Sequence, residues 1–187
     1  NKALREEYLA LLQRRDGDAA APAGERVKAL RRMVLLQGLP TETEPAGGDD
    51  SCSLRGLIWK LLLGAMHIDA MLYIRLVEQG ASWSDWKIRD DTFRTLRGDE
   101  EFQRRVPEDK LSRLNNAFVR LNFPDVDGLP ATPGLPVRMA AAEALVGLGS
   151  YGGYVQGMTI LCAPLLFVMP EVDAFFCFHA LLTRHIP

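Results

Sequence analysis

The stretch Glu108–Leu121, EDKLSRLNNAFVRL, carries the clearest helical pattern of the chain. Its apolar residues Leu111, Leu114, Phe118 and Leu121 follow one another at intervals of three or four positions, so they share one face of an α-helix. Most of the other positions are charged or polar. A helix with one apolar face buries that face against another element, and we therefore expect this segment to pack against other helices.

Segments on both sides of this helix repeat the same periodicity. Convincing alternation with a period of two, the mark of a half-buried strand, is absent from the sequence. The predicted fold class is all-α, with helices packed on helices and no sheet. Four further helices are expected before the Glu108–Leu121 segment: Leu4–Arg15, a helix through Val27, Leu30, Met33 and Val34 that Gly38 and Pro40 stop, a helix capped by Ser53 and ended by Gly64, and Asp69–Gln79. Another is expected to start at Ser82 or Ser84 and to run through Trp86 toward Thr95. After that segment we expect a helix over Val137–Leu148, then an apolar run from Met158 that contains Pro164 and breaks at Pro170, and finally a helix through Phe175 and Leu182.

Turn-forming residues divide the chain. Thr41–Asp50 (TETEPAGGDD) is polar, acidic and rich in turn formers. We predict a boundary there, with a helical extension and acidic loop over residues 1–50 and the main domain over residues 51–187. Phe123–Pro136, with four prolines and two glycines, is expected to be a long loop, and Gly149–Gly153 a turn.

The composition is that of an ordinary globular chain. Of its 187 residues 48% are apolar and 25% are charged, and the formal net charge is -2. This balance gives no electrostatic reason to expect binding to nucleic acid or to an anionic membrane. The three cysteines do not suggest a secreted disulfide framework, and no signal peptide is visible at the start. We expect a cytoplasmic protein without membrane insertion.

Common catalytic signatures do not explain the chain. It has no Gly-x-x-x-x-Gly-Lys loop, so it is not expected to bind a nucleotide through one. The close pair of possible metal ligands, Cys177 and His179 with His185 beyond, lacks the four-ligand spacing of a zinc site. We predict neither a metal site nor a cofactor of its own.

Three short strings carry the remaining chemical interest. They are Arg55–Gly64 (RGLIWKLLLG), Ile88–Thr95 (IRDDTFRT) and Tyr154–Met158 (YVQGM). Each string alone has an ordinary structural interpretation, such as a stacked pair of an arginine and a tryptophan one turn apart in the first. The arginine at the end of the second can be a solvated surface residue, and the glutamine of the third can satisfy backbone groups at a helix start.

Taken together and in this order, the strings resemble the TBC (Rab-GAP) domain family. Members of that family carry an R-x-x-x-W-x-x-L-L-G helix, then an I-x-x-D-x-x-R motif, and then a Y-x-Q-G motif. Leu96–Asp99 follows the second string here, where family members usually carry a proline. The matching residues are Arg55 and Trp59 in the first motif, Ile88, Asp91 and Arg94 in the second, with Thr95 after them, and Tyr154, Gln156 and Gly157 in the third.

The resemblance implies a GTPase-activating protein that lends two side chains to a partner GTPase. Arg94 is then the arginine finger and Gln156 the glutamine finger that positions the attacking water. A guanidinium supplied in trans stabilises the charge that spreads over the transferring phosphoryl group and contributes about 10³–10⁵ in rate. GTP and Mg²⁺ belong to the partner, and this chain needs no cofactor.

The resemblance also implies supporting roles for the other matched residues. Asp91 supports Arg94, and Ile88 anchors the same helix in the core. Tyr154 and Gly157 shape the loop that presents the glutamine. Arg55 and Trp59 are expected to be structural first and in contact with the GTPase second.

A closer resemblance points to one branch of the family. Leu36–Pro40, Cys52–Gly56, Ala163–Leu166 and Ala174–Phe176 look like the fungal mitotic-exit and spindle-position checkpoint branch. That branch implies a Rab-like small GTPase controlling mitotic exit or septation, a checkpoint scaffold that completes a two-component GAP, and a place at the spindle pole through that partner. The resemblance covers Leu36–Pro187 and implies the N-terminal half of a TBC domain, without the C-terminal half.

Alternatives to a catalytic reading stay open. In one, the same fold is a non-catalytic interaction module that binds the scaffold or the GTPase without accelerating hydrolysis. In another, the chain is an unrelated helical adaptor that matches the motifs by chance. Intact Arg94 and Gln156 favour the activator.

Overall fold

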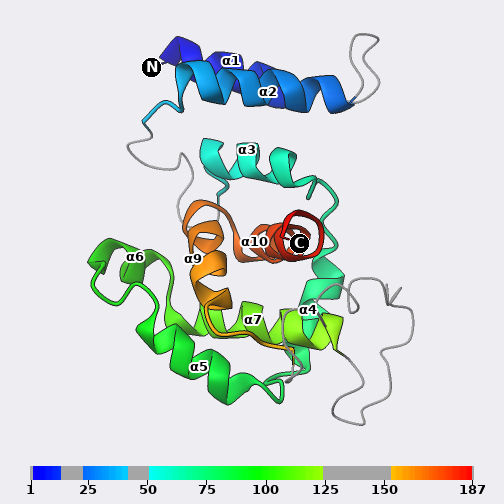
Figure 1. Cartoon of the computed structure of the whole chain (residues 1–187), viewed down its shortest axis with the longest axis vertical. Coiled ribbons are helices and arrows are strands. Elements are labelled where there is room, and N and C mark those ends of the chain that lie inside the picture. Colours follow the sequence, from blue (N-terminus) through cyan, green and yellow to red (C-terminus); the bar gives the residue numbers. More distant parts are fainter. Residues whose placement is uncertain (1, 14–22, 42–50, 124–152, 187) are drawn as a thin grey trace.

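The computed structural model describes residues 2–13, 23–41, 51–123 and 153–186 of the chain. Within these ranges it holds nine α-helices, one short π-helix and no strand, so the predicted all-α class is confirmed. In this part of the chain no helix is long and apolar enough to cross a bilayer. The elements, labelled as in Figure 1, are α1 (Lys2–Gln13), α2 (Ala23–Gln37), α3 (Leu54–Leu63), α4 (Ala70–Glu78), α5 (Asp85–Arg94), α6 (Glu100–Arg105), α7 (Glu108–Asn122), α9 (Met158–Val168), α10 (Glu171–Ala180) and the π-helix Leu181–His185.

The helices form a stack along the long axis of the molecule. Helices α1 and α2 lie side by side at one end, α3 follows, then α10, α7 and finally α5 at the other end (Figure 1). Helix α9 crosses beside the stack and contacts α3, α10, α7 and α5, whereas α4 packs against α7 and α10. Helix α7 therefore occupies the interior position that its apolar face predicts.

Two groups of buried residues hold the stack together. The larger lies among α4, α5, α7, α9 and α10 and includes Phe118, Phe175 and Phe178, each fully buried. The smaller joins α1, α2 and α3 through Tyr8, Leu30 and neighbouring aliphatic residues of α3. Trp59 of α3 packs against both groups, so α3 connects the N-terminal helices to the main body. The Tyr8 hydroxyl also donates to the carbonyl of Gly38 at 2.8 Å, which fastens α1 to the end of α2.

Several helix ends follow directly from the local sequence. Ser53 precedes α3, and its Oγ accepts the N–H of Gly56, as expected for an N-cap. Gly64 ends that helix with a φ of 68°, a left-handed conformation that favours glycine. Asp69 caps α4 in the same way that Ser53 caps α3. Ser84 occupies the position before α5 but makes no side-chain cap bond there.

One helix was not expected from the sequence, and several expected segments lie outside the described residues. Helix α6, whose N-cap Asp99 accepts the N–H of Phe102, was not expected from the sequence, because six residues are too few to show periodicity. The apolar run that contains Pro164 forms α9, which continues through this exposed proline and ends at Val168, and the predicted break at Pro170 is confirmed. The Val137–Leu148 helix, most of the expected loop and turn flanking it, and almost all of the acidic loop lie outside the described residues.

Candidate functional site

Arg94 is the last residue of α5 and presents its guanidinium to solvent. Its side chain is 54% exposed. One terminal nitrogen lies 2.9 Å from the carboxylate of Asp90, one turn back on the exposed side, and 3.8 Å from Asp91 Oδ1. An ion pair between two exposed side chains is weak and breaks readily. The guanidinium is therefore available for another anion.

Gln156 lies in the short turn that leads into α9 and is also exposed. The N–H of Met158 donates to the carbonyl of Val155 at 3.2 Å, closing the turn around the glutamine. Gly157 follows with a φ of 96° and serves as the N-cap residue of α9. A residue with a β-carbon is strained at this φ, so the glycine gives the turn its shape.

The buried carboxylate of Asp91 joins these two segments. Its Oδ2 accepts the Tyr154 hydroxyl at 2.7 Å, the N–H of Gly157 at 2.7 Å and the Thr159 hydroxyl at 3.1 Å. Its other oxygen faces Arg94. One carboxylate on α5 therefore fixes the residues on both sides of Gln156 relative to the arginine three positions further along the helix.

These hydrogen bonds also set the ionisation of the site. Burial by itself would raise the pKa of Asp91, but the donors from Tyr154, Gly157 and Thr159, helped by the charge of Arg94, outweigh it and lower that pKa. Burial, and then the hydrogen bond to Asp91, raises the pKa of the Tyr154 hydroxyl. Asp91 is therefore ionised and Tyr154 protonated at neutral pH, so the hydroxyl can donate its hydrogen bond to the carboxylate.

Two threonines form a second link between the same segments. The Thr95 hydroxyl lies 2.8 Å from Thr159 Oγ1 and 2.8 Å from the carbonyl oxygen of Asp91. Both threonines are buried. The sequence motifs did not single out Thr159, although it stands directly after the Tyr154–Met158 string. Only the contact with α5 reveals that it belongs to the site.

The remaining predicted residues divide into one that joins the site and two that do not. Ile88 is fully buried one turn before Asp91 and anchors α5 in the larger core. Arg55 is exposed and Trp59 half-buried on α3, which α10 and α7 separate from α5 (Figure 1). The structure therefore gives Trp59 a role in packing and does not bring either residue to Arg94.

The other end of α5 is held against α7. Asn116 Nδ2 donates to Asp85 Oδ1 at 2.7 Å, and Asn116 Oδ1 accepts the N–H and the hydroxyl of Ser82, each at 2.7 Å. Asp85 also pairs with Arg89 at 2.6 Å. This end of the helix is thus fixed by a buried amide, as the other end is by Asp91.

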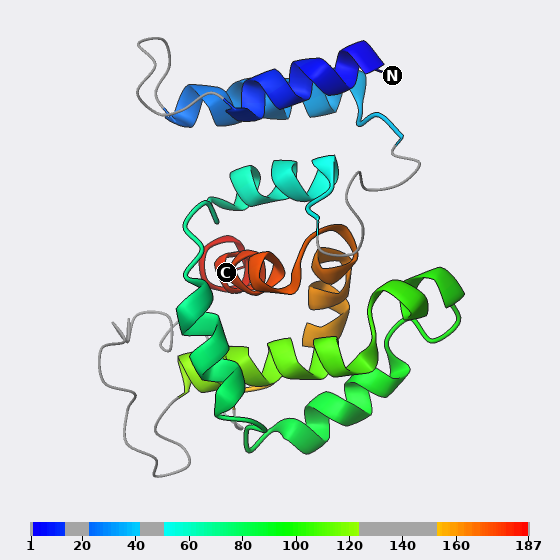
Figure 2. The ribbon, with the colours of Figure 1, turned by 180° about the vertical axis from the view of Figure 1, so that it is seen from behind.

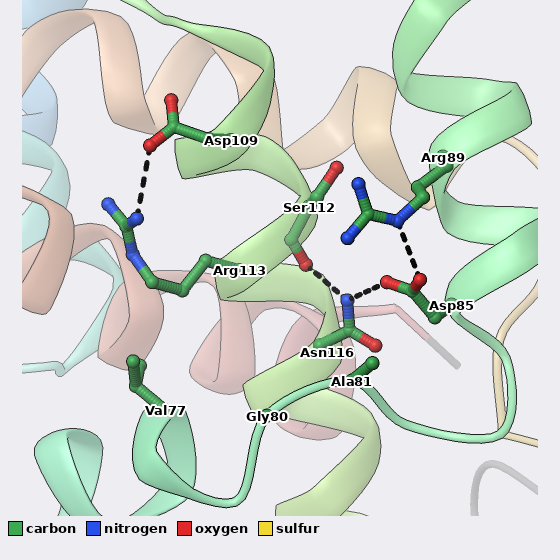
Figure 3. Close-up of a pocket in the computed structure, with 9 residues that line it drawn as sticks. All are labelled: Val77, Gly80, Ala81, Asp85, Arg89, Asp109, Ser112, Arg113 and Asn116. Atoms are coloured by element: carbon green, nitrogen blue, oxygen red, sulfur yellow. Dashed lines mark hydrogen bonds and ion pairs between the residues drawn. The ribbon is translucent and has the colours of Figure 1, made fainter.

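A pocket of about 280 Å³ opens beside that amide. Figure 3 shows its polar side chains already joined to one another, including Arg113 with Asp109 and Arg89 with Asp85. Neither Arg94 nor Gln156 reaches it. Its lining residues are Val77, Gly80, Ala81, Asp85, Arg89, Asp109, Ser112, Arg113 and Asn116.

No cluster of residues suited to a metal ion is found within the described ranges. Cys177 is buried, and burial, with a contribution from Arg184, lowers the pKa of His179. What the geometry offers is an exposed guanidinium and an exposed carboxamide on two segments that one buried carboxylate ties together. Such a pair suits recognition of an anionic group and of a water beside it.

Comparison with known proteins finds one matching domain family and several curated relatives. Residues 143–187 match the Rab-GTPase-TBC domain, a range that includes Gln156 and begins after Arg94. The whole chain is 38% identical over 193 residues to the putative mitotic check point protein BUB2 of Dictyostelium discoideum and covers 45% of that protein. No solved structure matches the chain.

Two yeast proteins show the same relationship. Cell division control protein 16 of Schizosaccharomyces pombe is 33% identical over 162 residues, which cover 86% of this chain and 43% of that protein. Mitotic check point protein BUB2 of Saccharomyces cerevisiae is 28% identical over 162 residues, which cover 84% and 47% respectively. The chain thus spans a little under half the length of these curated relatives. The chain is therefore similar to the Rab-GTPase-TBC domain over residues 143–187, and to these mitotic check point and cell division proteins over most of its length.

Proposed function

We propose that this chain contributes the catalytic side chains of a GTPase-activating protein for a Rab-like small GTPase. The observation that carries the proposal is the Asp91 carboxylate, which binds the N–H of Gly157 and the Tyr154 hydroxyl while facing Arg94. The buried carboxylate thus connects the two segments that carry the exposed Arg94 and Gln156, which are 62 positions apart in the sequence.

In this proposal Arg94 is the arginine finger. Its guanidinium leaves the exposed Asp90 carboxylate, 2.9 Å away, and binds the transferring phosphoryl group of GTP. Breaking an exposed ion pair costs about 1 kcal/mol or less. An arginine supplied in trans lowers the barrier by roughly 4–7 kcal/mol, the equivalent of about 10³–10⁵ in rate. The exchange of partners is therefore strongly favourable at the transition state.

Gln156 is the second finger. Its carboxamide offers one acceptor and two donors, which suit a water molecule that attacks the phosphorus atom. Gly157, held by Asp91, sets the direction of the turn that carries it. The GTPase then need not supply a water-positioning glutamine of its own.

The partners in this proposal follow from the resemblance to the TBC (Rab-GAP) family. The GTPase brings both GTP and Mg²⁺, and the chain binds no cofactor itself. The names of the relatives suggest a role in the cell cycle, and we place the GTPase in the control of mitotic exit or septation. A spindle checkpoint scaffold completes the activator, which is cytoplasmic and reaches the spindle pole through that partner.

Single-turnover GTP hydrolysis tests the proposal. The protein, at the full length of its open reading frame, is added to GTP-loaded Rab-like GTPases with and without the scaffold. Arg94→Ala should lower the limiting rate by about 10³ or more, and Gln156→Ala should also lower it. Arg75→Ala and Gln37→Ala, at exposed positions on α4 and α2, are matched controls and should not.

The rival function has its own signature in the same experiment. If wild-type protein binds the GTPase but neither Arg94→Ala nor Gln156→Ala changes the hydrolysis rate, the chain is a non-catalytic interaction module. If Arg94→Lys retains the full hydrolysis rate, the planar guanidinium with its paired N–H donors is not required, and the arginine-finger mechanism is wrong.

A further inference from the structure

Helix α5 carries two aromatic side chains that are exposed to solvent and lie outside both groups of buried residues. Trp86 is 69% and Phe93 48% exposed. They are seven positions apart, which is two helical turns, so both lie along one outer stripe of the helix. Aromatic residues are enriched among the side chains that contribute most to binding at protein interfaces, so a stripe of two is a candidate binding surface.

Each aromatic ring lies against a cation. Lys87 Nζ is 5.4 Å from the centre of the Trp86 ring, and the Arg97 guanidinium is 4.1 Å from the centre of the Phe93 ring. Neither cation forms an ion pair within the part of the chain that the structure describes. The stripe therefore combines apolar area with positive charge that is open to a partner.

The turn after α5 holds this arrangement in place. Leu96 has a φ of 49°, a conformation that is unusual for a residue with a branched side chain, and it is itself exposed. Its neighbour Thr95 is buried against α9. The turn directs Arg97 back over Phe93 instead of away from the helix, and strain of this kind is typically kept where a site needs it.

The stripe lies on the same helix as the finger. Phe93 directly precedes Arg94, and α5 lies at the end of the stack farthest from α1 and α2, where no other described helix covers its outer side (Figure 2). The chain as a whole has a formal net charge of -2. On this surface the exposed Asp90 carboxylate pairs with Arg94, whereas Lys87 and Arg97 lie on the aromatic rings, so these two cations are the charges offered to an anionic partner.

We propose that Trp86 and Phe93, with Lys87 and Arg97 on their rings, form the docking surface for the nucleotide-bearing face of the GTPase. This inference rests on the proposed function. The GTPase is expected to meet the stripe with apolar side chains bordered by carboxylates, next to the phosphates that Arg94 binds. The aromatics supply affinity in both ground and transition states, and Arg94 supplies rate.

The test separates these two contributions. Single-turnover hydrolysis is followed at increasing concentrations of the full-length protein, which yields a limiting rate and a half-saturating concentration. Trp86→Ala and Phe93→Ala should each raise the half-saturating concentration by about five- to thirty-fold, as central interface aromatics do. The limiting rate should stay within about twofold, because uniform binding does not change the chemical step.

Three further variants serve as controls for the loss of exposed apolar area, of charge and of the aromatic ring. Met71→Ala removes a side chain that is 62% exposed on α4 and should change neither quantity. Arg97→Gln should raise the half-saturating concentration, and added salt should weaken wild-type protein more than this variant. Phe93→Tyr keeps the ring and should retain most of the affinity.

Failure of this inference is distinct from failure of the proposed function. If Arg94→Ala abolishes activation while Trp86→Ala and Phe93→Ala leave the half-saturating concentration unchanged, the fingers stand and the docking surface is refuted. If the two aromatic substitutions instead lower the melting temperature or the oligomeric state of the full-length protein, the stripe is covered by the protein itself, and this proposal is wrong. If Arg94→Ala has no effect, the proposed function fails first.

Discussion

Replacing Asp91 by alanine should destabilise the protein far more than replacing its neighbour Asp90. The substitution leaves three donors without their acceptor: the Tyr154 hydroxyl, the Thr159 hydroxyl and the N–H of Gly157. Tyr154 and Thr159 are buried, so water replaces the lost acceptor poorly. The two segments that carry the proposed fingers then lose their main connection.

The magnitude follows from those contacts. A hydrogen bond to an ionised group contributes about 1.5–3 kcal/mol, and the burial of the carboxylate offsets part of the sum. We therefore expect Asp91→Ala to cost about 3 kcal/mol, a factor of about 100 in the unfolding equilibrium. Asp91→Asn keeps one oxygen as acceptor but loses the charge, and it should cost about 1 kcal/mol.

Urea unfolding followed by tryptophan fluorescence measures these values. With a slope of about 1–3 kcal/mol/M, the midpoint of Asp91→Ala should fall by about 1 M or more. Asp90→Ala is the control, because Asp90 pairs with Arg94 from a side chain that is 60% exposed, and it should cost about 0.5 kcal/mol or less. If Asp91→Ala lies within about 0.5 kcal/mol of Asp90→Ala, the carboxylate does not hold the two segments together.

The same substitution has a defined pH dependence. The pKa of Asp91 is lowered in the folded protein, so its contribution is present above the unfolded pKa of about 3.9 and is lost as pH falls through the lower folded value. The stability difference between wild type and Asp91→Asn should be constant from about pH 8 to about pH 5 and shrink below about pH 4. A difference that changes near pH 6.5 would implicate a histidine instead.

Three further substitutions test the local structure. Gly157→Ala places a β-carbon in open space but at a backbone φ of 96°. Backbone strain alone should therefore cost about 1–2 kcal/mol of stability and lower the melting temperature by about 3–6 °C. An unchanged melting temperature would contradict the left-handed conformation of the turn. Ser53→Ala removes the oxygen that accepts the N–H of Gly56 and should cost about 1 kcal/mol in urea unfolding, whereas Ser53→Thr should restore most of it. Tyr73→Phe removes a hydroxyl that donates to the Glu171 carboxylate at 2.5 Å, and calorimetry should show a loss of about 1.5–3 kcal/mol; a stabilised variant would refute that bond.

Periodicity and caps predicted much of the fold because they act over a few residues. The spacing of Leu111, Leu114 and Phe118 was enough to place α7 in the core, and Ser53 was enough to start α3. Helix α6 was missed because its six residues are held by a single cap and by Phe102 in the core. The contact of the N-terminal helices with α3 was also beyond a local reading, since Tyr8 and Leu30 reach Ile58 only after the chain folds back.

The site was accessible from the sequence only as motifs. Family resemblance named Arg94, Gln156 and their neighbours, and the structure shows Ile88 in the core and Asp91 hydrogen-bonded to Tyr154 and Gly157. Their catalytic roles stay predictions. The motifs did not indicate Thr159, because a single threonine that follows the Tyr154–Met158 string has no distinguishing pattern of its own.

By itself, the sequence determined that the chain is helical, where most of its helices begin and end, and which short strings deserve chemical attention. Those properties depend on side-chain periodicity and on backbone groups only three or four residues away. The tertiary structure alone decided that the Asp91 carboxylate accepts a hydrogen bond from the hydroxyl of Tyr154, 63 positions later in the sequence. It also decided that Trp86 and Phe93 remain outside the core. Such pairings depend on how α9 crosses α5 and on which faces the other helices cover, and no local pattern of residues encodes that geometry.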